Sequence, residues 1–191
     1  RSTLFPYTTL FRSRDGTFDA KHEFTDKVGN VCYSIGDGNV SIMLSGHVDE
    51  IALQVQYIDD KGFIHFVKDG GVDRKVLLGS TVMIMSSVTG ESIPGVIGKK
   101  PIHVEWYEED EKDKATKIKD MKIDIGVDTK EEAVALVGIG DPIIIQDIPL
   151  ELGHRFVGRG LDDKVGVFVV GEVMKQLSML GSRLNNVKVY L

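Results

Sequence analysis

The residues that could bind a metal or take part in catalysis fall into two short motifs that lie far apart in the sequence. The first runs Ser-Gly-His-Val-Asp-Glu over residues 45–50 and places His47 two positions before Asp49. A metal-binding imidazole needs its second ring nitrogen held by an acceptor, commonly a carboxylate, because that contact fixes the tautomer and raises the basicity of the ligand. His47 and Asp49 therefore suit a metal site, although a histidine hydrogen-bonded to a loop aspartate has the same pattern.

The second motif, Asp162-Asp163-Lys164, stands at the start of a segment with helical periodicity. Aspartate is favoured at a helix N-cap and in the first turn, where the helix dipole stabilises it by ~0.3–1 kcal/mol, so capping alone explains the motif. A carboxylate can also bridge two divalent ions ~3.5–4 Å apart. The occurrence of both motifs in one chain, on either side of a β-rich stretch, favours the metal explanation.

Three predicted elements position these motifs. Residues 40–44 form an apolar, β-rich run typical of a strand buried in a parallel sheet, and ligands of open α/β sheets bind beyond the carboxyl ends of such strands. We expect 187–191 to lie in the same sheet and 28–35 to pair with 40–44 as a hairpin or neighbour. The helix between them has apolar residues near a helical period, at positions 165, 168, 169, 173, 174, 177 and 180.

Between the motifs, short apolar runs alternate with turn residues at roughly 8 to 12 residue intervals, the spacing of a small all-β sandwich or barrel. The runs are 51–58, 63–67, 76–78, 81–85 and 93–97, followed by a short helix at 130–137 and a strand that ends at 145. We therefore expect an α/β fold interrupted by an inserted β module. The α/β domain would comprise residues 14–53 plus 147–191, and the insertion residues 54–146.

Composition restricts the partners. Of 191 residues 42% are hydrophobic, which is enough for a sizeable core. The formal charge of −6 disfavours nucleic acid, since phosphate binding needs clustered Lys and Arg. The single cysteine, Cys32, excludes an internal disulfide and fits a reducing compartment. No run approaches the ~18 apolar residues of a membrane span, so we expect a cytoplasmic protein with neither a membrane nor a nucleic-acid partner.

The first residues have a different origin. Residues 3–13, Thr-Leu-Phe-Pro-Tyr-Thr-Thr-Leu-Phe-Arg-Ser, look like the translation of a sequencing-adapter oligonucleotide. We treat 1–13 as a non-native segment and exclude it from fold reasoning. The native frame then begins near Arg14 without an initiator methionine, so we expect the true N-terminus to be missing.

Taken in order, the motifs resemble the dinuclear metallo-aminopeptidases of the tetrahedral (TET) type, whose members are named glutamyl or deblocking aminopeptidases and sometimes endoglucanases. The resemblance extends over about 28–191 and includes the Ser-Gly-His-Val-Asp-Glu-Ile and Gly-Leu-Asp-Asp-Lys-Val-Gly motifs. The matching stretches are 45–51, 70–71, 95–103, 123–126, 131–132, 138–142 and 160–166. Several matches in the right order are more specific than either metal motif alone.

The resemblance implies a zinc-peptidase-like α/β sheet as the catalytic domain and a barrel or PDZ-like β module that joins subunits into dimers and larger homo-oligomers. His47 and Asp162 would bind two divalent ions, zinc or cobalt, with Asp162 bridging them. Asp49 would have a catalytic role, the orientation of His47, and Asp163 would be a helix-start residue. Lys164 stands where relatives often carry arginine. The implied activity is hydrolysis of N-terminal residues from peptides by a metal-activated water.

In this family a Glu-Glu pair follows the strand expected at 187–191, the first as general base and the second as metal ligand, and a further carboxylate and a second histidine ligand follow later. We therefore expect a C-terminally truncated fragment that lacks these groups and is inactive alone. Two alternatives stay open. One is an endoglucanase-type glycoside hydrolase, which needs two carboxyl groups ~5–9.5 Å apart, and the other is a non-catalytic β interaction module. Only the peptidase requires two bound divalent ions.

Overall fold

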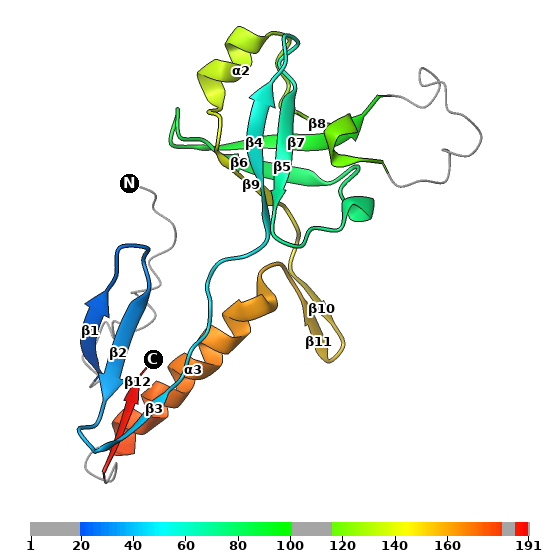
Figure 1. Ribbon diagram of the computed structural model, residues 1–191. Coiled ribbons are helices and arrows are strands. Elements are labelled where there is room, and N and C mark those ends of the chain that lie inside the picture. The colour runs from blue at the N-terminus through cyan, green and yellow to red at the C-terminus, as the bar shows by residue number, and fades with distance from the viewer. Residues whose placement is uncertain (1–19, 101–115, 181–185, 191) are drawn as a thin grey trace. The chain divides into compact units, whose positions relative to one another are not determined.

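The computed structural model describes residues 20–100, 116–180 and 186–190. It divides into two compact units, shown in Figure 1. We call the first the α/β unit, made of the chain up to Glu50 and from Gly160 onward, and the second the barrel unit, Ile51–Arg159. The segment that we interpret as non-native, 1–13, lies outside the described residues.

The α/β unit is built on a four-stranded sheet with the strand order β1-β2-β12-β3. β3 (Val40–Met43) and β12 (Val187–Tyr190) pair in parallel, so the two strands predicted to share a sheet are neighbours in it. On its other side β12 pairs antiparallel with β2 (Val31–Ile35). β1 (Lys21–Thr25), which we did not predict, adds an antiparallel edge to β2. The sheet is therefore mixed, with its one described parallel pair next to the first motif.

The predicted direct pairing of β2 with β3 is wrong, because β12 lies between them. The chain entering β12 occupies the position where a hairpin partner would lie: Asn39 N–H donates to Asn186 Oδ1 over 3.0 Å. A Cβ on Gly38 would overlap the backbone of Asn186, so glycine is needed for this approach. The Gly-rich turn at 36–39 suggests a hairpin, but it leaves room for β12 between β2 and β3.

The long helix α3 (Leu161–Leu180) packs on this sheet through one narrow face. Val167, Val170 and Met174 are its buried residues, and Met174 contacts the cluster of buried side chains from β2 and β12. Of the predicted apolar positions on this helix, only Met174 is fully buried, and Val165, Phe168 and Val169 are at least half exposed. The helix is apolar around much of its circumference, so periodicity located the helix but not the face that meets the sheet.

The barrel unit contains the predicted all-β module, a closed six-stranded barrel with the order β4-β5-β8-β7-β6-β9. Alternate residues point inward, and Leu53, Ile64, Ile84, Ile123 and Ile143 are at most 1% exposed. Burial of these side chains, each contributing ~1.5–3 kcal/mol, stabilises the module. The strands are β4 Ala52–Ile58, β5 Ile64–Asp69, β6 Thr81–Met85, β7 Ser92–Lys99, β8 Met121–Asp124 and β9 Pro142–Ile145.

The remaining elements of the barrel unit are short. Helix α2 (Lys130–Leu136) starts at a capping box in which Thr129 and Glu132 exchange side-chain to backbone hydrogen bonds. The strand predicted at 76–78 is wrong, because Val76 is the last residue of a 3₁₀ turn (η1, Arg74–Val76) and Leu77 is the C-cap of that turn. A second 3₁₀ turn, η3 (Ile118–Asp120), precedes β8, and β10 (Leu150–Leu152) and β11 (Arg155–Val157) form a hairpin that we did not predict. Within the described ranges, no helix has the length and apolar composition needed to cross a membrane.

A partly buried carboxylate stabilises the turn between β4 and β5. Asp59, whose side chain is 13% exposed, pairs with Lys122 Nζ at 2.6 Å and faces His65 Nε2 at 3.3 Å. Its carboxylate also accepts the backbone N–H groups of Lys61 and Phe63, each over 3.1 Å. Burial raises the pKa of Asp59, but the hydrogen bonds from Lys122, His65 and the backbone outweigh it and lower the pKa from 3.8 to about 2.

We predict that Asp59→Asn lowers the free energy of unfolding by about 2 kcal/mol at pH 7, the equivalent of the pKa depression at ~1.4 kcal/mol per unit. Because the folded-state pKa is depressed, this stability is complete above the unfolded pKa and is lost as the pH falls through the folded value. The difference between variant and parent should therefore shrink from pH 4 toward pH 2. Urea unfolding at several pH values measures it.

Asp60→Asn is the matched control, since Asp60 is 98% exposed and its nearest cation, Lys130, is 3.8 Å away. That variant should stay within ~0.5 kcal/mol of the parent at every pH. An equal effect of the two substitutions would contradict the assignment of the stability to the buried cluster.

Candidate metal centre

The structure brings the two motifs together at one imidazole. His47 Nε2 lies 3.1 Å from Asp162 Oδ1, although 115 positions separate the two residues. His47 Nδ1 lies 3.1 Å from Asp49 Oδ1. One ring nitrogen of His47 thus faces the start of the helix, and the other faces the neighbouring carboxylate.

The topology of the α/β unit explains this approach. β3 and β12 are parallel neighbours, so the chain must return to the starting edge of the sheet between them, and α3 makes that return. The helix therefore begins near the sheet edge where β3 ends. His47 follows β3 and Asp162 stands at the start of α3, which places both at the same edge while the barrel unit occupies the intervening sequence.

The start of α3 is shaped to receive the His47 loop. Asp162 and Asp163 have non-helical backbone angles, and the peptide bond between them is cis. The Asp163 carboxylate accepts Gly166 N–H over 3.1 Å, as an N-cap does, and His47 N–H over 3.4 Å. A Cβ on Gly46 would lie 2.8 Å from Val167 N, so glycine permits the close approach of loop and helix. Asp163 thus acts as a helix-start residue.

The site is open to solvent in the described structure. The side chains of His47, Asp49 and Asp162 are 54%, 87% and 96% exposed. Desolvation lowers the pKa of His47, but the charge of Asp49 and the hydrogen bond with Asp162 outweigh it and leave the pKa above its ordinary value of 6.5. Two carboxylates facing one imidazole form a locally negative site, which suits a cation.

The donor set fits a divalent ion. Zinc takes histidine nitrogen at ~2.0–2.1 Å and carboxylate oxygen at ~2.0–2.2 Å, so two such atoms on one ion lie about 3 to 3.6 Å apart. The 3.1 Å between His47 Nε2 and Asp162 Oδ1 falls in this range. Nitrogen and oxygen donors together suit zinc or cobalt. In the part of the chain that the structure describes, no group of three His, Cys, Asp or Glu residues is arranged to hold an ion, so His47 and Asp162 would form at most part of a ligand set.

Sequence reasoning missed one link between the motifs. Lys164 Nζ lies 3.1 Å from Glu50 Oε2, with the two side chains 32% and 18% exposed. The signal was present, because opposite charges stand at the ends of two motifs that were expected to meet. We considered Lys164 only as a replacement for arginine and gave Glu50 no partner.

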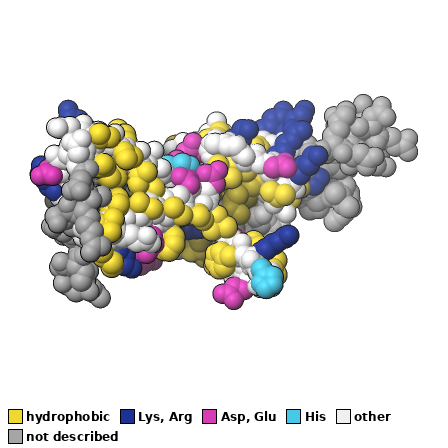
Figure 2. All heavy atoms as spheres, turned by 90° about the horizontal axis from the view of Figure 1, so that it is seen from below, with side chains coloured by type: hydrophobic (Ala, Val, Ile, Leu, Met, Phe, Trp, Pro, Cys, Tyr) yellow, Lys and Arg dark blue, Asp and Glu magenta, His cyan; other side chains and the backbone are white. Residues whose placement is uncertain are grey.

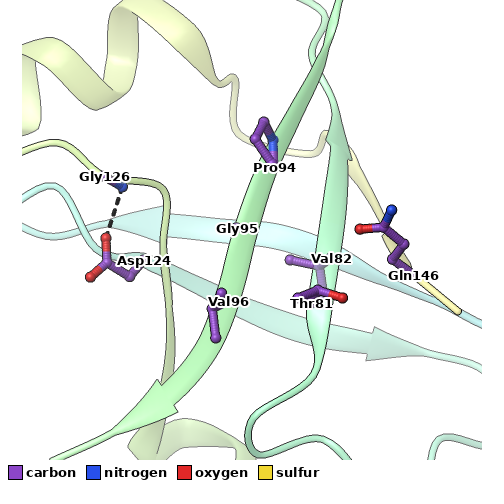
Figure 3. Close-up of a pocket in the computed structure, with 8 residues that line it drawn as sticks. All are labelled: Thr81, Val82, Pro94, Gly95, Val96, Asp124, Gly126 and Gln146. Carbon is purple, nitrogen blue, oxygen red and sulfur yellow. Dashed lines mark hydrogen bonds between the residues drawn. The ribbon is translucent and has the colours of Figure 1, made fainter.

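A cavity of about 380 Å³ on the barrel unit offers no comparable chemistry. Figure 3 shows it over β6 and β7, with Pro94, Val96 and Val82 among the side chains that line it. Its one ionisable lining residue among those described, Asp124, accepts Gly126 N–H over 2.8 Å. The described lining contains neither a histidine nor a second carboxylate.

Comparisons with known proteins find relatives that carry aminopeptidase names. A family model described as M42 glutamyl aminopeptidase matches residues 29–191. A relative from Acetivibrio thermocellus that carries an aminopeptidase name is 34% identical over 154 residues, which are 80% of this chain and 42% of the relative. The lysyl aminopeptidase of Pyrococcus furiosus is 30% identical over 158 residues, 80% of this chain and 44% of that protein.

Solved structures show the same fold. The TET1 peptidase of Pyrococcus horikoshii, which can assemble into a tetrahedron or a large octahedral shell, matches with a TM-score of 0.77 and 31% identity over 91% of this chain and 51% of its own. An endoglucanase from Thermotoga maritima matches with a TM-score of 0.68 and 25% identity over 92% of this chain and 49% of its own. The chain thus spans about half the length of these proteins. Because the family model includes both motifs and the whole barrel unit, the chain belongs to the M42 glutamyl aminopeptidase family.

Proposed function

We propose that the whole protein is a dinuclear metal-dependent aminopeptidase that hydrolyses N-terminal residues from peptides. The observation that carries this proposal is the 3.1 Å approach of His47 Nε2 to Asp162 Oδ1 while Asp49 holds the other ring nitrogen. The aminopeptidase names of relatives support the reaction class. The arrangement of one histidine and one exposed carboxylate supports the metals.

Each of the three residues has a distinct task. Asp49 accepts the Nδ1 proton of His47, which leaves the Nε2 lone pair directed at the metal site. Asp162 has two carboxylate oxygens on a 96% exposed side chain, so it is able to bind two ions at once. When bound, a pair of divalent ions, zinc or cobalt, would polarise the scissile carbonyl and lower the pKa of a water toward neutrality.

Neither His47 nor Asp162 is available as the general base, because their donor atoms are used on the metals. Asp49 is engaged with His47 Nδ1. Glu50 pairs with Lys164, and Asp163 accepts backbone N–H groups of Gly166 and His47. We therefore expect the proton of the attacking water to go to a carboxylate outside the two motifs. Two ligands also bind an ion weakly compared with the four of an ordinary zinc site. We therefore propose that the 191-residue chain by itself is inactive.

The endoglucanase name of one structural neighbour raises a second reaction class. A glycosidase holds two carboxyl groups on either side of the scissile glycosidic bond. Here Asp49 and Asp162 face different nitrogens of one imidazole, so the ring of His47 occupies the space between the two carboxylates. This geometry favours metal binding over glycoside hydrolysis.

The activity test compares free and N-acetylated peptides as substrates of the whole protein. We expect release of the N-terminal residue from the free peptide alone, and loss of activity on chelation with recovery on adding Zn²⁺ or Co²⁺. His47→Ala and Asp162→Asn should each lower kcat/KM by at least about 100-fold. His22→Ala is the matched control, an exposed histidine of the α/β unit bonded to Thr25, and should leave kcat/KM unchanged. Chelator-resistant activity, or cellulose cleavage in place of peptide cleavage, would contradict the proposal.

Asp49 is tested by Asp49→Asn. The amide keeps an acceptor oxygen for His47 Nδ1 but removes the charge, so we expect metal to remain bound while kcat falls ~10–100-fold. Metal content and kcat are measured on the same preparation. An unchanged kcat would show that Asp49 does not support the reaction through His47.

We further propose that the barrel unit joins subunits into a homo-oligomer, a role that the tetrahedral and octahedral assemblies of the TET1 peptidase support. Figure 2, a view of the whole chain, shows hydrophobic side chains mixed with charged and other polar ones on the visible face. The barrel unit exposes large apolar residues, among them Val76, Ile139 and Ile148, each at least 65% exposed. Light scattering of the whole protein should give a multiple of the subunit mass. A monomer at micromolar concentration would exclude this part of the proposal.

A further inference from the structure

A second link, outside the expected metal ligands, joins the two motifs. Lys164 Nζ and Glu50 Oε2 are 3.1 Å apart, and their side chains are 32% and 18% exposed. Another ion pair of the same helix, Lys175 with Glu172 at 3.5 Å, is 48% and 43% exposed. Solvent screens exposed pairs strongly and sheltered pairs much less. The Glu50–Lys164 pair is therefore the stronger of the two.

The turn before α3 packs closely against this ion pair. Gly160 adopts φ +64°, and a Cβ at this position would overlap both the Lys164 ammonium and the Glu50 carboxylate. Lys164 N–H donates to Gly160 O over 3.3 Å. The ion pair thus packs directly on the turn that leads, two residues later, to Asp162. A change in the pair acts on the backbone that positions this carboxylate.

The contact between His47 and Asp162, the expected metal ligands, should contribute less stability than the Glu50–Lys164 pair. His47 and Asp162 are 54% and 96% exposed, and exposed pairs contribute ~0–1 kcal/mol. The backbone bond of His47 N–H to Asp163 is 3.4 Å long. We expect both contacts to be weaker than a sheltered ion pair. Metal ligands bind tightly when the surrounding residues hold them near their bound geometry, which requires a further link.

We propose that Glu50 and Lys164 are positioning residues, whose ion pair holds the His47 loop against the start of α3 and thereby sets the approach of His47 to Asp162. This inference rests on the proposed function, since the metal ions are what the positioned ligands bind. Without Glu50, the Lys164 ammonium stands partly buried beside the turn and lacks this counter-charge. The loop and the turn then lose their common support, and a positive charge remains close to a cation site.

The test is titration of the whole protein with Co²⁺ alone, followed by its visible absorption, which reports both affinity and ligand geometry without catalysis. We expect Glu50→Gln and Lys164→Met each to weaken Co²⁺ binding about tenfold and to change the spectrum. The double variant should be no weaker than either single variant, because both remove the same link. Lys164→Arg keeps the pair and should bind within about twofold of the parent. Thermal unfolding confirms that each variant is folded.

Glu172→Gln is the matched control, because it breaks the exposed pair of the same helix. It should leave Co²⁺ binding unchanged. The positioning role would be overturned if Glu50→Gln bound Co²⁺ as tightly as the control variant. It would also be overturned if the double variant lost as much affinity as the two single variants combined. Either result would leave the metal proposal standing. A parent protein that fails to bind Co²⁺ would instead overturn the proposed function.

Discussion

The candidate metal centre depends on one contact, the 3.1 Å approach of His47 Nε2 to Asp162 Oδ1. It joins a loop that follows a β-strand to the first turn of a helix that comes after an entire barrel in the sequence. Nothing in either motif alone requires a metal, since a loop histidine and a helix cap are ordinary features. They converge at one edge of the sheet, with Asp49 on the remaining ring nitrogen, and this convergence is the basis for the proposed metal-binding role.

This contact follows from strand pairing. β3 and β12 lie side by side in parallel, so α3 must begin at the edge where β3 ends. The long separation in sequence has no effect on this geometry, because the barrel closes on itself and has its own core. Glycines at 46 and 160 then allow the loop and the turn to approach the helix start more closely than side chains would permit.

The sequence predicted the parts of the fold that depend on local pattern. Alternating apolar residues with regular turns identified the barrel, and β6 (Thr81–Met85) has the predicted bounds. Prediction from the sequence failed where long-range packing determines which elements are neighbours. The turn before β3 suggested a hairpin, but the chain enters β12 at Asn186, beside Asn39, and no local signal in 36–39 indicates pairing with a strand so far along the chain. The buried face of α3 was missed because the helix is apolar on more than one side.

The residues of the candidate site could be predicted from the sequence, but the ion pair that links their two loops could not. His-x-Asp and Asp-Asp at element boundaries have recognisable spacing, whereas the Glu50–Lys164 pair has meaning only once the two loops meet. Metal content tests the shared role of His47 and Asp162 most directly. The whole protein, dialysed after loading with Zn²⁺, should retain about two ions per subunit. Asp162→Asn should lose both, because one carboxylate serves both ions. Retention of both ions by this variant would contradict a bridging role for Asp162 and the dinuclear centre built on it.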